Sequence, residues 1–295
     1  MFPASFEYVA PSTLDQAVRL LQQYGPDARL LAGGQSLIPM MRFRLANPRV
    51  LIDLNRLPGL DFLEEDGGML RIGAMVRHRT MERASLIQRR YPLLADTARV
   101  VADPIVRNRG TVGGAVAHAD PAGDWGAALL AAKAEVVIAG PKGRRIGRRT
   151  IPLAEFFTGP FMTALEPGEI VTEIRVPTPG PREAGAYLKI ERKVGDFAVV
   201  AVGVQIALDA DGVCRKAGIG LCAVGSTSLR AQEAEEWLIG KRLDESVIAR
   251  AGELAAAAAQ PTSDTRGPAE YKRDVVRVLT IRALRKALER IPMVG

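Results

Sequence analysis

Two short glycine-bearing stretches decide the fold of this chain. They are Ala32-Gly33-Gly34-Gln35-Ser36-Leu37 and Thr111-Val112-Gly113-Gly114-Ala115. Both combine small side chains with a hydroxyl group, and consecutive backbone amides in such turns form concave nests that bind anions. Because glycine has no side chain, a phosphate can approach the backbone closely. The two loops together therefore predict a site for a diphosphate, with the hydroxyls of Ser36 and Thr111 as additional donors.

Neither stretch matches the two commonest nucleotide-binding fingerprints. A dinucleotide-binding GxGxxG opens a helix and has an acidic residue about 20 positions later, and the P-loop reads GxxxxGK[ST]. Neither pattern is present in either stretch. Taken singly, each glycine pair could be a simple turn, because glycine pairs are common in turns. The two loops become informative only together with the residues around them.

Hydrophobic periodicity predicts a first unit of mixed helices and strands around these loops. A helix is expected between Ser12, which can cap it, and Gly25-Pro26, which stops it. The basic run 141–149 is interpreted as a solvated hairpin tip, because runs of charge usually lie on the surface. The remaining expected elements are strands at 29–32, 50–54, 134–138 and 170–176, a hairpin over 60–75, two helices over 79–101 and a helix at 125–132.

A second unit is expected after the proline-rich segment Pro177–Pro181, whose three prolines suit an extended connector. Three antiparallel strands are predicted at 186–192, 199–208 and 213–224, followed by helices at 227–239, 244–259 and 268–290. The predicted fold class is α+β. The expected domains are residues 1–177, divided near residue 56 into 1–56 and 57–177, and residues 178–295.

Composition excludes several classes of protein. A hydrophobic fraction of 47% with 25% charged residues is typical of a folded chain, and no apolar run approaches the roughly 20 residues of a membrane helix. The first residues carry no secretory signal pattern, so a cytoplasmic location is expected. The net charge of +7 comes with few aromatic residues and no nucleic-acid-reading motif, which favours an anionic ligand or an acidic partner over nucleic acid.

The cysteine count excludes metal centres built by this chain. Only Cys214 and Cys222 occur, whereas an iron–sulfur cluster or a structural zinc needs about four close ligands. Both cysteines are interpreted as buried thiols. The sequence therefore predicts no metal site.

The surroundings of the two loops resemble the FAD-binding (medium) subunits of the molybdenum hydroxylase, or xanthine dehydrogenase, family, and within it the aerobic carbon monoxide dehydrogenase type. The resemblance covers nearly the whole chain. It is carried by AGGQSL at 32–37 followed by Asp53-Leu54, RNRGTVGG at 107–114, DPAGD at 120–124, KIERKVGDF at 189–197 and PAEY at 268–271. It implies a two-part FAD-binding domain of the p-cresol methylhydroxylase type. A C-terminal domain with a three-stranded antiparallel sheet and a helical bundle would follow.

The resemblance also implies which residues bind FAD non-covalently. Ala32, Gly33, Gly34, Gln35, Ser36 and Leu37 would hold the diphosphate, and Thr111, Gly113, Gly114 and Ala115 would close over the same cofactor. Ala115 stands where the family often has Asn, so one side-chain hydrogen bond is missing. No residue of the chain is expected to be catalytic.

Three further positions match cofactor-contacting residues of the family. Asp124 would accept hydrogen bonds from ribityl and sugar hydroxyls, Lys189 would lie near the pyrimidine side of the flavin, and Phe197 would cover a flavin face. Their alternatives are a helix cap for Asp124, a solvated side chain for Lys189 and core packing for Phe197. His118, close to the second loop, is interpreted as structural.

The function implied by the resemblance is an electron relay. The partners would be a large molybdenum-cofactor subunit, which holds the molybdopterin, and a small subunit with [2Fe-2S] clusters, in a dimer of heterotrimers. Two alternatives stay open. One is a stand-alone FAD-dependent oxidase or reductase, and the other is an assembly subunit without a cofactor.

Overall fold

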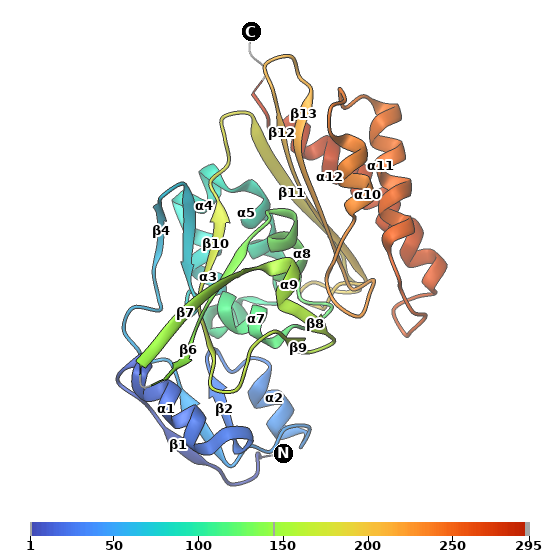
Figure 1. Cartoon of the computed structure of the whole chain (residues 1–295). Coiled ribbons are helices and arrows are strands. Elements are labelled where there is room, and N and C mark those ends of the chain that lie inside the picture. The colour runs from blue at the N-terminus through green and yellow to red at the C-terminus, as the bar shows by residue number, and fades with distance from the viewer. Residues whose placement is uncertain (1, 144, 293–295) are drawn as a thin grey trace.

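The computed structural model describes residues 2–143 and 145–292, so Arg144 of the basic run lies outside the described residues. Helices and strands alternate in an α+β arrangement, as the sequence predicts (Figure 1). A three-stranded parallel sheet lies near the N-terminus in the order β1-β3-β2, formed by β1 (Glu7–Val9), β2 (Ala28–Leu31) and β3 (Val50–Asp53). All four residues of β3 are buried, as is usual for a central parallel strand.

Two helices accompany this sheet. Helix α1 (Leu14–Tyr24) buries Ala17 and Val18 in the small core. Its cap is one residue later than expected, because the Thr13 hydroxyl, and not that of Ser12, accepts the amide hydrogen of Gln16. Helix α2 (Leu37–Arg42) follows the first glycine loop directly, and a short 3₁₀ turn (Gly25–Asp27) leads into β2.

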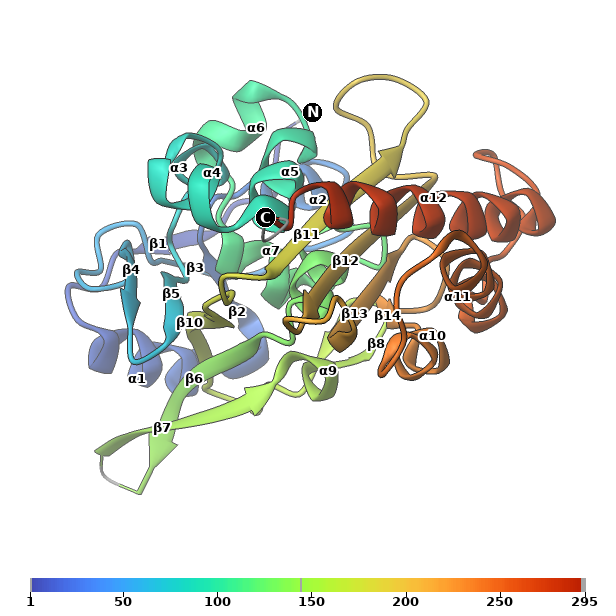
Figure 2. The same cartoon turned by 90° about the horizontal axis from the view of Figure 1, so that it is seen from above.

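The next unit is built on a five-stranded antiparallel sheet. Its order is β4-β5-β10-β6-β7, with β4 (Leu63–Asp66), β5 (Met69–Gly73), β10 (Ile170–Pro177), β6 (Glu135–Lys142) and β7 (Arg145–Pro152). The β4-β5 pair confirms the hairpin expected over residues 60–75. The β6-β7 hairpin projects from the body of the molecule (Figure 2). Much of the basic run is therefore strand, and within it Arg149 forms a two-bond ion pair with Glu169.

Short helices cover this sheet, and two expectations about them are wrong. Residues 79–101 hold three helices where two were expected, because Ala84 and Tyr91 each end a helix. Residues 112–118 are helical, although the second glycine loop was expected to have no regular structure. The elements are α3 (His78–Arg83), α4 (Ser85–Arg90), α5 (Pro92–Val100), α6 (Pro104–Arg109), α7 (Val112–His118), α8 (Asp124–Ala131), α9 (Leu153–Phe156), β8 (Phe157–Gly159) and β9 (Met162–Thr163).

The C-terminal part contains the three predicted antiparallel strands and a short fourth one. The strands are β11 (Glu183–Ile190), β12 (Val200–Leu208), β13 (Cys214–Cys222) and β14 (Leu229–Arg230), in that order in the sheet. The helix expected at 227–239 begins later than predicted, because β14 occupies residues 229–230. The helices are α10 (Gln232–Leu238), α11 (Glu245–Ala258) and α12 (Ala269–Glu289). Cys214 and Cys222 are buried free thiols, as expected.

Glycines on β13 let helix α8 lie directly on this sheet. An ideal Cβ on Gly218 would come within 1.9 Å of the carbonyl oxygen of Ala131, and one on Gly220 within 1.9 Å of that of Ala127. Ile219, between them, points to the opposite face and packs in the cluster with α10, α11 and α12. The sheet is therefore covered by α5 and α8 on one face and by the C-terminal helices on the other (Figure 1).

An ion pair also joins the end of the C-terminal helix α12 to α5. The Arg290 guanidinium donates to both carboxylate oxygens of Asp96 on α5, at 2.8 and 3.0 Å. None of the helices in the described ranges is long and apolar enough to cross a membrane.

Candidate functional site

The fold brings the two glycine loops into direct contact. An ideal Cβ on Gly33 would lie 2.3 Å from the carbonyl oxygen of Arg109 and 2.7 Å from the Cα of Gly110. An ideal Cβ on Gly114 would lie 3.4 Å from the Cβ of Ala32. The two stretches, almost eighty positions apart in the chain, thus form one continuous surface, as the prediction of a shared site requires.

The first loop presents backbone amides that can bind an anion. It runs from the end of β2 to the start of α2 without forming a helix or strand. In the described part of the chain no protein acceptor bonds the amides of residues 33–36. Gly34 has a φ of +75°, which only glycine adopts without strain and which helps to turn successive amides the same way. The loop therefore leaves several backbone amides available to an anion, and its assignment to a diphosphate stays a prediction.

The second loop differs from the expectation, because its amides are already used. The amides of Val112 and Gly113 donate to the carbonyls of Val76 and Ala74, and that of Gly114 donates to the Thr111 hydroxyl at 3.1 Å. The Thr111 side chain caps α7, so these residues are the first turn of a helix docked on the segment after β5. The second loop can therefore contribute close packing and helix dipole to a phosphate, but no row of free amides.

A polar network that the sequence did not predict joins the two loops. The side-chain amide of Asn55 donates to the carbonyl of Ala32 at 2.8 Å, and its oxygen accepts from Arg77 at 2.5 Å. Arg77 also donates to the carbonyl of Arg109. These two residues therefore tie the first loop to the second.

Asp53 holds Asn55 in this network through hydrogen bonds. It accepts hydrogen bonds from Tyr8 and from the side chain and backbone amide of Asn55. Burial raises the pKa of Asp53, but these hydrogen bonds outweigh it and hold the pKa below its ordinary value. The available signal was two polar residues, Asp53 and Asn55, immediately at the end of a buried strand.

Asp124 and Lys189 form a buried ion pair. The Lys189 ammonium, with 1% of its side chain exposed, lies 3.0 Å from the Asp124 carboxylate and 2.9 Å from the carbonyl of Val100. The Tyr187 hydroxyl donates to the other oxygen of Asp124 at 2.9 Å. Burial raises the pKa of Asp124 by more than the Lys189 charge and these hydrogen bonds lower it. Lys189 is therefore not a solvated side chain.

The helix-cap alternative for Asp124 is also wrong. Gly123 is the N-cap of α8, and Asp124 is the first helical residue. Its carboxylate faces β11 of the C-terminal sheet through Tyr187 and Lys189.

Phe197 lies apart from the other predicted residues. Its side chain is 50% exposed, and the Arg266 guanidinium lies 5.9 Å from its ring centre. Among the described residues no hydrogen bond or ring contact joins Phe197 to either glycine loop. Core packing does not explain a half-exposed ring. His118 contacts Phe161, with ring centres 5.2 Å apart and the ring planes tilted by 50°.

His78 supports the second loop from the protein interior. Its Nδ1 accepts a hydrogen bond from the Trp125 indole at 3.0 Å, and an ideal Cβ on Gly110 would lie 2.7 Å from its Nε2. The imidazole is 5% exposed, and burial, together with the charges of Arg107 and Arg77, lowers its pKa to about 4. His78 is therefore neutral at physiological pH.

Protonation of His78 predicts a pH-dependent stability. In the unfolded chain the imidazole takes up a proton as the pH falls below 6.5, but in the folded chain it does so only near pH 4. The free energy of unfolding should therefore fall by about 3 kcal/mol between pH 6.5 and 4 on account of this group. Urea denaturation at several pH values measures the slope. His78→Gln, which cannot titrate, should show a flatter one, and equal slopes would contradict the assignment.

The chain matches two family models that together cover most of its length. Residues 4–179 match the FAD binding domain in molybdopterin dehydrogenase, and residues 185–287 match the CO dehydrogenase flavoprotein C-terminal domain.

Individual relatives match the chain over nearly its full length. It is 42% identical to the carbon monoxide dehydrogenase medium chain of Hydrogenophaga pseudoflava, over 98% of this chain and 99% of that one. It is 38% identical to the 6-hydroxypseudooxynicotine dehydrogenase complex subunit alpha of Paenarthrobacter nicotinovorans, over 98% of this chain and 97% of that one. A solved structure of carbon monoxide dehydrogenase from Hydrogenophaga pseudoflava, which lacks the Mo-pyranopterin moiety of its cofactor, superposes with a TM-score of 0.95. The two are 43% identical, over 99% of this chain and 100% of that one.

Proposed function

Because this chain belongs to the family of FAD-binding medium subunits of molybdenum hydroxylases, and is thus an oxidoreductase subunit, we propose that it relays electrons from a partner's [2Fe-2S] clusters to a terminal acceptor. The observation that carries this proposal is the convergence of two glycine loops, one of which presents unbonded amides. A bound flavin supplies the chemistry of such a relay, because it can take up and release electrons singly or in pairs. The residues of this chain bind and orient it.

We propose that the first loop binds the FAD diphosphate. The amides of residues 33–36 would donate to its oxygens, with the Ser36 hydroxyl beside them. Ala32 and Leu37 would flank the diphosphate, and Gln35, whose amide group lies 3.4 Å from the Gly33 carbonyl, would stiffen the loop. Thr111, Gly113, Gly114 and Ala115 would close the other side with the first turn of α7.

We also propose roles for the three remaining predicted residues. Asp124 and Lys189 would act as a unit, because they are paired with each other in the protein interior, with Lys189 turned toward the flavin pyrimidine and Asp124 toward hydroxyls of the cofactor. The half-exposed ring of Phe197 would cover a flavin face. Stacking on such an exposed ring would exclude water from one side of the flavin.

We propose a large molybdenum-cofactor subunit and a small [2Fe-2S] subunit as partners, in a dimer of heterotrimers. The names of the relatives support a multi-subunit assembly, because one is a medium chain and the other a subunit of a dehydrogenase complex. The chain would divide into residues 1–177, which bind FAD, and residues 178–295. The extents of the two family models support this division.

Purification of the tagged protein from its own host tests this function. We expect about one FAD per chain, two co-purifying polypeptides, and molybdenum and iron in the same fraction. Flavin with substrate turnover by the chain alone would instead indicate a stand-alone oxidase or reductase. A colourless protein that still assembles would indicate a cofactor-free assembly subunit.

A further inference from the structure

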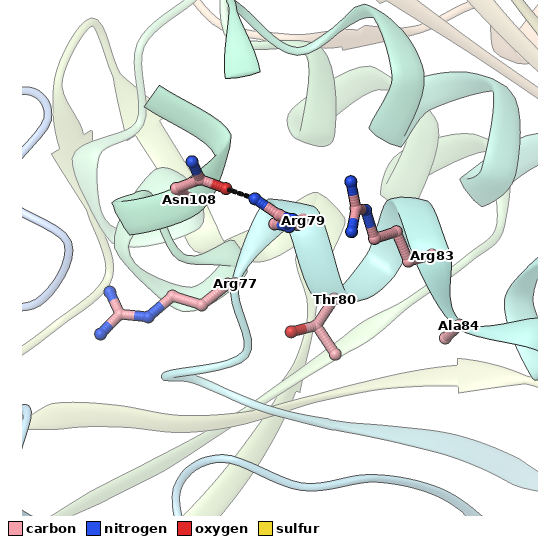
Figure 3. A pocket seen from close by; sticks show the side chains of 6 residues that line it. All are labelled: Arg77, Arg79, Thr80, Arg83, Ala84 and Asn108. Carbon is pink, nitrogen blue, oxygen red and sulfur yellow. Dashed lines mark hydrogen bonds between the residues drawn. The ribbon is translucent and has the colours of Figure 1, made fainter. Parts of the chain in front are cut away.

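An arginine-rich pocket lies on the outer surface beside the second loop. It has a volume of about 420 Å³, and its walls come from α3, its flanking residues and α6. The lining residues are Arg77, Arg79, Thr80, Arg83, Ala84 and Asn108 (Figure 3). The lining thus includes three arginines, an amide and a hydroxyl, and no acidic side chain, although the guanidinium of Arg77 is turned toward Asn55 and the carbonyl of Arg109.

The arginines of this pocket are not neutralised by the protein. Arg79 donates to the neutral side-chain oxygen of Asn108 at 2.6 Å. Glu82, the acidic residue of α3, is turned to Arg107 at 3.0 Å. Within the described ranges no carboxylate lies within ion-pair distance of Arg79 or Arg83, whereas many arginines elsewhere have one, for example Arg71, Arg149, Arg230 and Arg290.

Two unpaired positive charges at this spacing destabilise the free protein. Arg79 and Arg83 are four positions apart on one helix, where like charges repel. Burial and then the Arg109 charge lower the pKa of Arg77, so a third positive charge beside these two is also disfavoured in the free protein. A bound anion would remove this repulsion, so the pocket gains stability by being filled.

The donor set fits a phosphate group better than a carboxylate. Guanidinium groups bind phosphate oxygens through paired hydrogen bonds, and the Asn108 amide nitrogen and the Thr80 hydroxyl can add further donors. A carboxylate has only two oxygens to share among these groups, whereas a phosphate has three or four and carries up to two charges. We propose that this pocket binds a phosphate group, either free or carried by a small molecule.

The pocket is separate from the proposed diphosphate loop, although they share a wall. The Arg77 guanidinium is occupied by the Arg109 carbonyl and by Asn55, on the side of the glycine loops. Arg79 and Arg83 lie on the other side, and in Figure 3 the Arg77 side chain points away from both. Recognition in the pocket therefore depends on Arg79 and Arg83, and the retention of FAD does not.

Calorimetric titration of the FAD-loaded protein with inorganic phosphate and with AMP, at constant ionic strength, tests the proposal. We expect saturable binding that Arg79→Gln/Arg83→Gln weakens by about tenfold or more, since each charged hydrogen bond contributes appreciably. The matched control is Arg273→Gln/Arg282→Gln, which removes the same charge from exposed positions on α12 and should leave binding unchanged. The flavin absorbance of the Arg79/Arg83 variant should equal that of the wild type.

The comparison of ligands shows which kind of anion the pocket binds. Tighter binding of AMP than of phosphate assigns the pocket to a phosphate-bearing molecule, and equal or weaker binding assigns it to the free ion. Three results would overturn the proposal: no saturable binding, equal weakening by the control variant, or tighter binding of a triglutamate peptide, which would indicate an acidic protein. Loss of FAD from the Arg79/Arg83 variant would instead place the pocket within the cofactor site. The binding results do not depend on whether the chain relays electrons.

Discussion

Gly33→Val is expected to lose nearly all FAD while the rest of the chain stays folded. The Cβ would lie 2.3 Å from the Arg109 carbonyl oxygen and 2.7 Å from the Gly110 Cα, and both neighbours are backbone that no rotamer change can move. The side chain must therefore push the two loops apart, which removes the shared surface that the cofactor needs. Overpacking of this severity reduces FAD content about tenfold or more. The flavin absorbance per chain after desalting measures the effect.

A matched control separates this effect from general destabilisation. Gly180→Val adds the same side chain to the connector after β10, where the nearest atom to an ideal Cβ is a glutamate oxygen 3.9 Å away, and it should retain full flavin. Gly114→Val should also lose FAD, because its Cβ would lie 2.6 Å from the Thr111 hydroxyl that caps α7. Full flavin stoichiometry in Gly33→Val would contradict the assignment of the loops.

Lys189→Met is expected to lower the free energy of unfolding by about 3–5 kcal/mol. The substitution leaves Asp124, which is 7% exposed, without its counter-ion, and removing one partner of a buried ion pair costs about this much. Part of the cost will appear as protonation of Asp124, because burial already raises the pKa of this carboxyl. Urea denaturation of the flavin-free protein at pH 7 measures the change.

The double variant Lys189→Met/Asp124→Asn provides the control. It removes both charges and keeps an oxygen that the Tyr187 hydroxyl can donate to, so it should recover most of the lost stability. If the single and double variants were equally destabilised, the charge pair would not be the cause.

A lower flavin midpoint potential in Lys189→Met, expected because a cation stabilises the reduced ring, stays a prediction. The Asp124 charge beside Lys189 should reduce this shift.

The sequence predicted elements well where the signal is local. The β4-β5 hairpin follows from its turn residues, and the three long strands of the C-terminal sheet follow from their alternation. The same local reasoning failed at residues 112–118, because two glycines argue against a helix. That helix forms because Thr111 caps it and because the amides of its first turn find acceptors at Ala74 and Val76, which are distant in the chain.

The candidate site was predictable in its residue types but not in its internal contacts. The glycine loops were recognisable by composition, and their meeting at Gly33 and Arg109 is a property of the tertiary fold. The pairing of Asp124 with Lys189 joins residues 65 positions apart, and no periodicity encodes such a contact. Asn55 and Arg77 were missed for the same reason, because each acts on a loop far from it in sequence.

The seating of α8 on Gly218 and Gly220 makes the two halves of the protein mutually dependent. The helix that begins with Asp124 rests on β13, and the ammonium that neutralises this carboxylate comes from β11. A fragment ending before residue 183 would lack Lys189, so the buried Asp124 would have no counter-ion. The side of α8 that packs on β13 would be exposed to solvent. We therefore expect the amino-terminal half not to fold stably alone, because its interior charge and one flank of α8 are completed by β11 and β13.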